Sequence, residues 1–243
     1  MKKRIKAFGC SLTAQHHWQY MFNDDIDYTG DFRVAGNDAI ELESYAIGSG
    51  SNDMQFVQYI NEVYHGNILS DDIIVWQITS PHRRLVHIDN IPGTHMSDSN
   101  GRLDHDNGYI DVPSIFKPEH IIQGKDLSTA QHHNLMPPAT IIEAGIELYT
   151  LLLQLNGVKR DNNKLLVLFG WDDIFESPYE KQNVMQFLQD RGIDYLEESI
   201  LEWSVENNYN TMKTFHPEQA AYIAYTREVL VPKLKSLESI GWL

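Results

Sequence analysis

Apolar residues gather in short runs along this chain, and the runs lack the alternation of a half-exposed strand. They occupy residues 4–10, 42–48, 72–79, 164–171 and, more weakly, 192–197. Continuous runs of this length are typical of strands that are covered on both faces, as in a parallel sheet. We therefore expect five buried strands.

Segments with apolar residues at helical spacing lie between these runs. The predicted helices span 52–66, 138–156, 178–190 and 217–238. Pro138, Pro178 and Pro217 each fit the first position of a helix, and Asp190 to Gly192 fits a helix end. Strands that alternate with helices predict a three-layer α/β/α sandwich with a central parallel sheet of about five strands.

Residues 80–137 interrupt this alternation. They contain five prolines, several glycines and asparagines, and seven of the 11 histidines. A long loop-rich insertion in a compact domain usually serves as a lid, a binding surface or an oligomer contact. We predict one domain, 1–243, with an insertion at about 80–137 through which a homo-oligomer would form.

Composition and charge narrow the function. The chain is 42% hydrophobic, enough for a core, and its formal charge of −15 disfavours nucleic acid and anionic membranes as partners. It has no run of about 20 apolar residues and no secretory signal pattern at its start, so we expect a cytoplasmic protein. Cys10 is the only cysteine, and we interpret it as a small buried hydrophobic residue.

Polar turns follow the first three predicted strands. Ser11 follows the first, GSGSN (48–52) the second and TSPHRR (79–84) the third, and His216 stands just before the last helix. The carboxyl ends of parallel strands meet at one edge of a sheet, where ligands bind. A serine, backbone N–H groups and a histidine at that edge are the parts that acyl transfer requires.

These motifs resemble the SGNH/GDSL hydrolases. The resemblance rests on FGCSLT near the start, the Gly/Asn turn, the polar turn after the third strand and the HP pair that opens the last helix. It is closest to a divergent branch, frequent among phage and bacterial hypothetical proteins, whose first motif is of the GCS(F/L)T type. It covers most of the chain outside 80–137, and it implies a flavodoxin-like SGNH fold and a carboxylic ester hydrolase.

The resemblance also implies roles for individual residues. Ser11 would be the nucleophile, and its own N–H would be one oxyanion donor. The glycine of the second block falls at Ser49, so that Ser49 or Gly50 would supply a second N–H. The asparagine of the third block falls near Thr79, whose hydroxyl could still donate but with a shorter reach.

The last block departs from the family. His216 would be the general base, but the aspartate usually found three residues before it is replaced by Lys213. A lysine cannot hold the imidazole tautomer or stabilise its cation. A backbone carbonyl, Glu206 or Glu218 would have to orient His216 instead, or catalysis is lost.

Several residues have both a structural and a substrate-binding interpretation. Asn52 and Asp172 could contact substrate or cap the adjoining helix or turn. Arg83 could bind a substrate carboxylate or pair with a nearby acid. Trp18 and Trp171 could line a pocket that stacks on a sugar, or simply pack.

No cofactor or metal is expected. The adjacent pairs His16–His17 and His132–His133 invite a metal site, but neighbouring side chains diverge on a regular element and no HExxH spacing is present. A nucleotide-binding protein is disfavoured because no GxGxxG or Walker-type loop occurs. Ester hydrolysis by a serine needs no cofactor.

Two hypotheses of different classes remain. The first is a serine esterase or deacylase that acts through an acyl-enzyme on a small-molecule or glycan acyl ester, such as an O-acylated carbohydrate, or that transfers the acyl group to another hydroxyl. The second is a catalytically weakened SGNH fold that serves as a binding or structural module. If the protein is of phage origin, such a module could associate with the virion, with 80–137 as its interaction surface.

Overall fold

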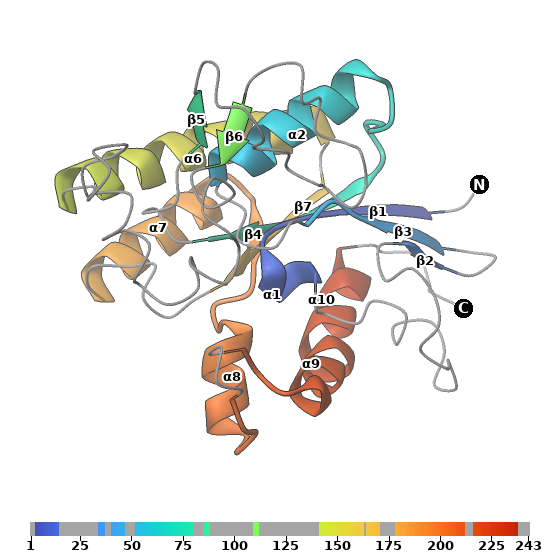
Figure 1. Cartoon of the computed structure of the whole chain (residues 1–243), viewed down its shortest axis with the longest axis vertical. Helices are drawn as coiled ribbons and strands as arrows, with labels where there is room; N and C mark the ends of the chain where they lie inside the picture. Colours follow the sequence, from blue (N-terminus) through green and yellow to red (C-terminus); the bar gives the residue numbers. More distant parts are fainter. Residues whose placement is uncertain are drawn as a thin grey trace.

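A six-stranded sheet forms the centre of the computed structural model (Figure 1). In spatial order it comprises β2 (Val34–Gly36), β3 (Ile40–Ser44), β1 (Lys3–Phe8), β4 (Ile73–Ile78), β7 (Lys164–Phe169) and β8 (Asp194–Tyr195). The structure describes residues 3–14, 34–36, 40–46, 52–79, 85–87, 109–111, 141–162, 164–170, 178–211 and 216–237.

The strand order confirms the predicted fold class. Five strands, β3, β1, β4, β7 and β8, pair in parallel, and β2 is an antiparallel edge strand. The parallel strands, numbered along the chain, lie in the order 2-1-3-4-5, which is the flavodoxin-like arrangement. In such a sheet the strand order reverses beside the first strand. Ligands bind at this position, outside the carboxyl ends of the strands.

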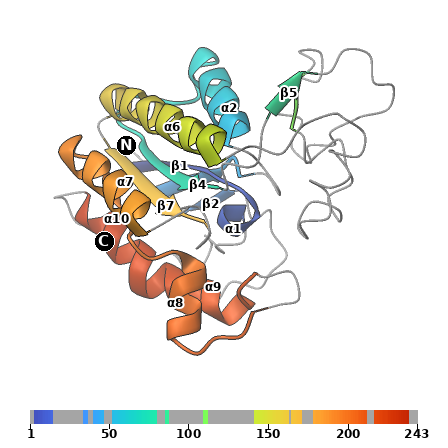
Figure 2. The same cartoon turned by 90° about the vertical axis from the view of Figure 1, so that its left-hand side faces the viewer.

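Helices cover both faces of the sheet (Figures 1 and 2). One face carries α2 (Asn52–Tyr64), α6 (Ile141–Asn162) and α7 (Pro178–Asp190). The other carries α1 (Ser11–Ala14), α8 (Ile200–Glu206), α9 (Gln219–Tyr225), the π-helical segment η4 (Thr226–Leu230) and α10 (Val231–Ser236). Of the helices that the structure describes, none is both long enough and apolar enough to cross a membrane.

The central strand β4 shows why the apolar runs lack alternation. All six of its residues are buried. Ile74 and Trp76 join the core beneath α2, α6 and α7, whereas Ile73 and Val75 join the core beneath α8, α9 and α10. Since both faces of the strand are covered, apolar residues are favoured at successive positions.

The predicted elements are present, with differences at their ends. Helix α7 has the predicted bounds, with Pro178 as its first residue and Gly192 in the left-handed region just beyond it at φ 61°. Strand β1 ends at Phe8, two residues earlier than predicted, and α6 (Ile141–Asn162) continues beyond its predicted end at 156. Pro138, its predicted first residue, lies outside the described residues. Helix α8 and strand β2 were not predicted.

The last predicted helix, 217–238, is divided. Helix α9 begins at Gln219, and the five-residue π segment separates it from α10. Pro232 lies at the start of α10. Proline donates no N–H and its ring clashes with the carbonyl four residues earlier, so the wider π turn before it accommodates Pro232 without ending the helix.

A small second sheet lies within the predicted insertion. Strands β5 (Leu85–His87) and β6 (Tyr109–Asp111) pair in an antiparallel manner, with Val86 opposite Ile110. The remaining residues of 80–137 lie outside the described part of the chain. The roles of this segment as a lid or as an oligomer contact stay predictions.

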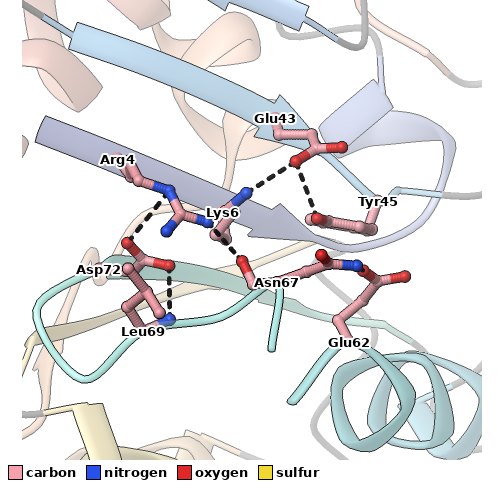
Figure 3. Close-up of polar contacts among 8 residues, drawn as sticks. All are labelled: Arg4, Lys6, Glu43, Tyr45, Glu62, Asn67, Leu69 and Asp72. Carbon is pink, nitrogen blue, oxygen red and sulfur yellow. Dashed lines mark hydrogen bonds and ion pairs between the residues drawn. The ribbon is translucent and has the colours of Figure 1, made fainter. Parts of the chain in front are cut away.

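Charged side chains lie between β1, β3 and the segment that joins α2 to β4 (Figure 3). We call them the Lys6 cluster: Arg4, Lys6, Glu43, Tyr45, Glu62, Asn67, Leu69 and Asp72. The Lys6 Nζ lies 2.7 Å from Glu43 Oε2, which also accepts a 2.9 Å hydrogen bond from the Tyr45 hydroxyl. Arg4 pairs with Asp72 and donates to the Asn67 carbonyl, so the cluster joins three elements around the first strand.

The Asp72 carboxyl makes stability depend on pH. Burial, the largest influence, raises its pKa above the usual 3.8, although the Leu69 N–H and the Arg4 charge oppose this. A raised pKa means that the protonated form favours the fold and that this stability is lost as pH rises through the folded-state pKa. We expect wild type, relative to Asp72→Asn, to lose unfolding free energy from about pH 4 upward, as measured by urea unfolding at a series of pH values. A wild-type unfolding free energy that rises with pH relative to that of Asp72→Asn would contradict this assignment.

Candidate functional site

The predicted nucleophile lies at the carboxyl edge of the sheet. Strand β1 ends at Phe8, and Gly9 and Cys10 lead directly into α1, whose first residue is Ser11. Cys10 and Leu12, on either side of Ser11, are completely buried. Cys10 is buried in the core as predicted, but its thiol also donates a hydrogen bond to Gln77 Oε1, so it is more than a small hydrophobic residue.

The turn at Gly9 is too tight for a side chain. A Cβ atom at Gly9 would lie 2.1 Å from Thr13 Oγ1, 2.5 Å from Thr13 Cβ and 3.0 Å from Gln77 Cβ. Glycine is the residue that lets two backbone segments approach this closely. The glycine of the FGCSLT motif thus permits α1 to begin immediately above the end of β1.

Asn52 and Thr79 join two neighbouring elements at the same edge. The Thr79 N–H donates to Asn52 Oδ1 and the Asn52 Nδ2 donates to the Thr79 carbonyl, both at 2.9 Å. Both residues are buried. The Asn52 amide therefore ties the first turn of α2 to the end of β4. The predicted roles of Asn52 in substrate binding and of the Thr79 hydroxyl in oxyanion binding stay predictions.

His216 is held at the start of the last helical region. Thr211 and Pro217 form an isolated bridge, and the Glu218 N–H donates to the Asn210 carbonyl at 3.0 Å. Pro217 therefore lies in this bridge and is not the first helical residue, because α9 begins two residues later. His216, directly before it, is buried.

The helix that follows His216 packs beside the serine turn. Tyr222 and Tyr225 of α9 belong to the same core cluster as Cys10 and Leu12. Burial raises the pKa of the Tyr222 phenol, and the neighbouring Cys10 raises it further. Residues of α9 and the residue before Ser11 therefore belong to one core cluster, although they lie far apart in the sequence.

The carboxylates considered as partners of His216 have other contacts. Glu218 Oε1 accepts a 3.3 Å hydrogen bond from the Asn210 N–H. Glu206 hydrogen bonds with Glu198, and burial together with this contact raises the pKa of the Glu198 carboxyl. Orientation of the His216 imidazole by Glu206, by Glu218 or by a backbone carbonyl stays a prediction.

The other predicted site residues lie outside the described part of the chain. They are Ser49, Gly50, Arg83, Asp172, Lys213, Trp18 and Trp171. The histidine pairs 16–17 and 132–133 lie outside it as well. Within the ranges that the structure describes, no three His, Cys, Asp or Glu residues are grouped as metal ligands would be.

Sequence reasoning overlooked Gln77, which the structure places directly beneath the serine turn. Its side chain is buried, and its Oε1 accepts hydrogen bonds from Cys10 and Thr13. One signal was present: Gln77 is the only polar residue within the run IIVWQI. A polar residue in the centre of a buried strand usually has a specific partner.

Comparison with known proteins finds likeness in structure only. No family model matches the chain, and no curated protein matches it. A catalytic mutant of an acetylxylan esterase from Geobacillus stearothermophilus is similar, with 10% identity, coverage of 100% of this chain and 98% of that one, and a TM-score of 0.48. The likeness is one of fold.

Two further solved structures are similar at the same level. A Bacillus subtilis protein has 12% identity and a TM-score of 0.49 over 100% of this chain, which spans only 58% of that protein. A member of the lipolytic G-D-S-L family from Veillonella parvula has 12% identity and a TM-score of 0.41, covering 93% of this chain and 97% of that one.

Proposed function

We propose that this chain is a serine esterase or deacylase of SGNH type that acts through an acyl-enzyme. The observation that carries the proposal is that α9, which follows His216, and the turn that carries Ser11 contribute side chains to the same core cluster. The order of the sequence motifs predicts a nucleophilic serine and a basic histidine. The shared core cluster supports the proposal that the two residues act together at one edge of the sheet.

In the proposed reaction, Ser11 Oγ attacks the ester carbonyl while His216 removes its proton. The oxyanion that forms accepts hydrogen bonds from the Ser11 N–H, from the N–H of Ser49 or Gly50, and from the Thr79 hydroxyl. His216 then returns the proton to the leaving alcohol, which departs as the acyl-enzyme forms. Water, deprotonated by His216, attacks the acyl-enzyme and releases the carboxylic acid and free Ser11.

The proposed substrates are neutral acyl esters of small molecules or glycans, including O-acylated carbohydrates. A formal charge of −15 disfavours polyanionic substrates, because a protein with this negative charge repels polyanions at long range. Trp18 and Trp171 are the residues that we propose to stack on a sugar ring. Transfer of the acyl group to another hydroxyl would use the same acyl-enzyme.

The test is covalent labelling with a fluorophosphonate, followed by intact-mass analysis. We expect a single adduct on the wild-type chain, none on Ser11→Ala, and labelling slowed by about 100-fold or more in His216→Ala. Ser236→Ala is the matched control, since Ser236 is an exposed serine on α10 and should not alter labelling. The adduct should map to Ser11.

A folded wild-type chain that takes up no adduct would contradict the proposal. The weakened SGNH module would then be favoured, with Lys213 in place of the usual aspartate as the reason. An adduct that maps to another serine and persists in Ser11→Ala would also contradict the proposal, because the reactive group would lie elsewhere.

A further inference from the structure

A single buried side chain contacts both ends of the turn that carries Ser11. Gln77 Oε1 accepts a hydrogen bond from the Cys10 thiol, with Sγ at 3.3 Å, and another from the Thr13 N–H at 3.1 Å. Cys10 directly precedes Ser11 and Thr13 follows it by two residues. One oxygen atom therefore bridges the segment on either side of the predicted nucleophile.

The amide orientation of Gln77 is determined by its partners. A backbone N–H can only donate, so the atom that faces Thr13 must be the carbonyl oxygen. Thr13 lies in the first turn of α1, where N–H groups have no partner within the helix. Gln77 thus caps α1 from beneath, in place of the N-cap side chain that longer helices often use.

Two glycines leave room for this side chain between neighbouring strands. A Cβ at Gly9, after β1, would lie 3.0 Å from Gln77 Cβ, and a Cβ at Gly170, after β7, would lie 3.3 Å from Gln77 Cδ. Gly170 is also held to β4 by a 2.9 Å hydrogen bond from its N–H to the Ile78 carbonyl. The Gln77 side chain therefore lies between two glycine positions, where any larger residue would contact it.

Stability alone does not favour glutamine at this position. Gln77 Nε2 is buried and has no hydrogen-bond partner in the part of the chain that the structure describes. A buried donor without a partner makes an amide less favourable than an apolar side chain of the same shape. The two hydrogen bonds to the turn are what the amide provides that methionine or leucine would not.

We infer that Gln77 is a positioning residue, which holds the Cys10 and Thr13 backbone so that Ser11 is presented at the carboxyl edge of the sheet. This inference rests on the proposed function of Ser11 as the nucleophile. Gln77 acts through the turn and does not touch the substrate. Reactions of this kind lose about 100-fold in rate when a reacting group is displaced by about 1 Å, so a loosened turn has a measurable effect.

The test replaces Gln77 with methionine, which has a similar length and no strong acceptor. Gln58→Met is the matched control, because Gln58 is as deeply buried but lies on α2, on the opposite face of the sheet. We expect Gln77→Met to slow fluorophosphonate labelling of Ser11 by about 100-fold, and Gln58→Met to label at the wild-type rate. Equal slowing in both variants, or none in Gln77→Met, would overturn the inference.

An infrared measurement tests the hydrogen bond independently of activity. Cys10 is the only cysteine, so the S–H stretching band of the protein reports on this thiol alone. In the wild-type chain we expect the band at a lower frequency than that of a free thiol, because Cys10 donates to Gln77 Oε1. A wild-type band at the free-thiol frequency would overturn the inference even if Gln77→Met fails to fold.

The two proposals fail in different ways. If the wild-type chain takes up no adduct while the Cys10 band shows a hydrogen-bonded thiol, the proposed function is wrong and the contact that Gln77 makes is retained. If the wild-type chain is labelled at Ser11 while Gln77→Met is labelled equally fast, the proposed function holds and the positioning role of Gln77 is wrong.

Discussion

Replacing Gly9 with alanine is expected to lower the free energy of unfolding by about 3 kcal/mol or more. The added Cβ would lie 2.1 Å from Thr13 Oγ1 and 2.5 Å from Thr13 Cβ, well inside van der Waals contact. Thr13 is completely buried in α1 and cannot swing into solvent. Either the turn or α1 must move, and urea unfolding of the purified variant would measure the cost.

Gly157→Ala provides the matched control for this prediction. Gly157 lies in α6, and no atom lies within 4 Å of an added Cβ there. Alanine in a helix is more favourable than glycine by about 0.5 to 1 kcal/mol, so this variant should be as stable as wild type or more stable. Removing the obstructing side chain in Gly9→Ala/Thr13→Gly should restore part of the loss. Equal stabilities of Gly9→Ala and Gly157→Ala would contradict the steric argument.

Glu43→Leu is expected to destabilise the fold by about 3 to 5 kcal/mol, the usual range when one partner of a buried ion pair is removed. The Lys6 side chain is only 3% exposed, and its Nζ lies 2.7 Å from Glu43 Oε2. Without Glu43, the ammonium group loses its ion-pair partner at 2.7 Å while it remains out of water. Urea unfolding at neutral pH would measure the change.

The reverse substitution should cost less. In Lys6→Met the remaining Glu43 is 21% exposed, so its carboxylate can be hydrated. It can also still accept the hydrogen bond from the Tyr45 hydroxyl. The double variant Glu43→Leu/Lys6→Met should recover most of the loss, because it leaves neither member of this pair charged without its partner. A double variant no more stable than Glu43→Leu would show that the loss of unfolding free energy does not come from breaking the Lys6–Glu43 ion pair.

The sheet could be predicted because its strands are buried on both faces. Burial of every residue of β4 requires the continuous apolar run that marked it in the sequence. Helix α7 could be predicted to the residue, since Pro178 and Gly192 have conformational preferences that act locally. Chain order and the position of polar turns were then sufficient to predict that Ser11 would follow the first strand at the carboxyl edge.

Helix α8 and strand β2 were missed for different reasons. Helix α8 has a complete capping box, in which Ser199 and Glu202 exchange hydrogen bonds, and that signal could have been recognised. The edge strand β2 has only three residues and gains its form from pairing with β3. The π segment before Pro232 has a local cause in that proline, but the proline alone did not show that the helix would continue beyond it.

The site shows the same division between local and distant information. The motif predicts a serine in a tight turn, but the hydrogen bonds from Cys10 and Thr13 to Gln77 join residues on different strands. Tyr222 and Cys10, which belong to the same core cluster, are equally distant in sequence. Such contacts follow from the strand order and from the face on which each side chain lies, and only the structure provides both.

The central position of β1 has a consequence for how the chain folds. Strand β1 pairs with β3, where Lys3 lies opposite Ile40, and with β4, where Ile5 lies opposite Ile73, and both partners come later in the chain. Strand β4 cannot pair with β7 until β7 has been synthesised. In this pairing Ile73 lies opposite Lys164, and the whole of 80–137 comes between the two strands in the sequence. Parallel pairing across such separations closes long loops before it gains contacts, which makes folding slow. The nascent chain thus carries an apolar strand with two open edges during much of its synthesis, the state in which chaperones bind and aggregation begins.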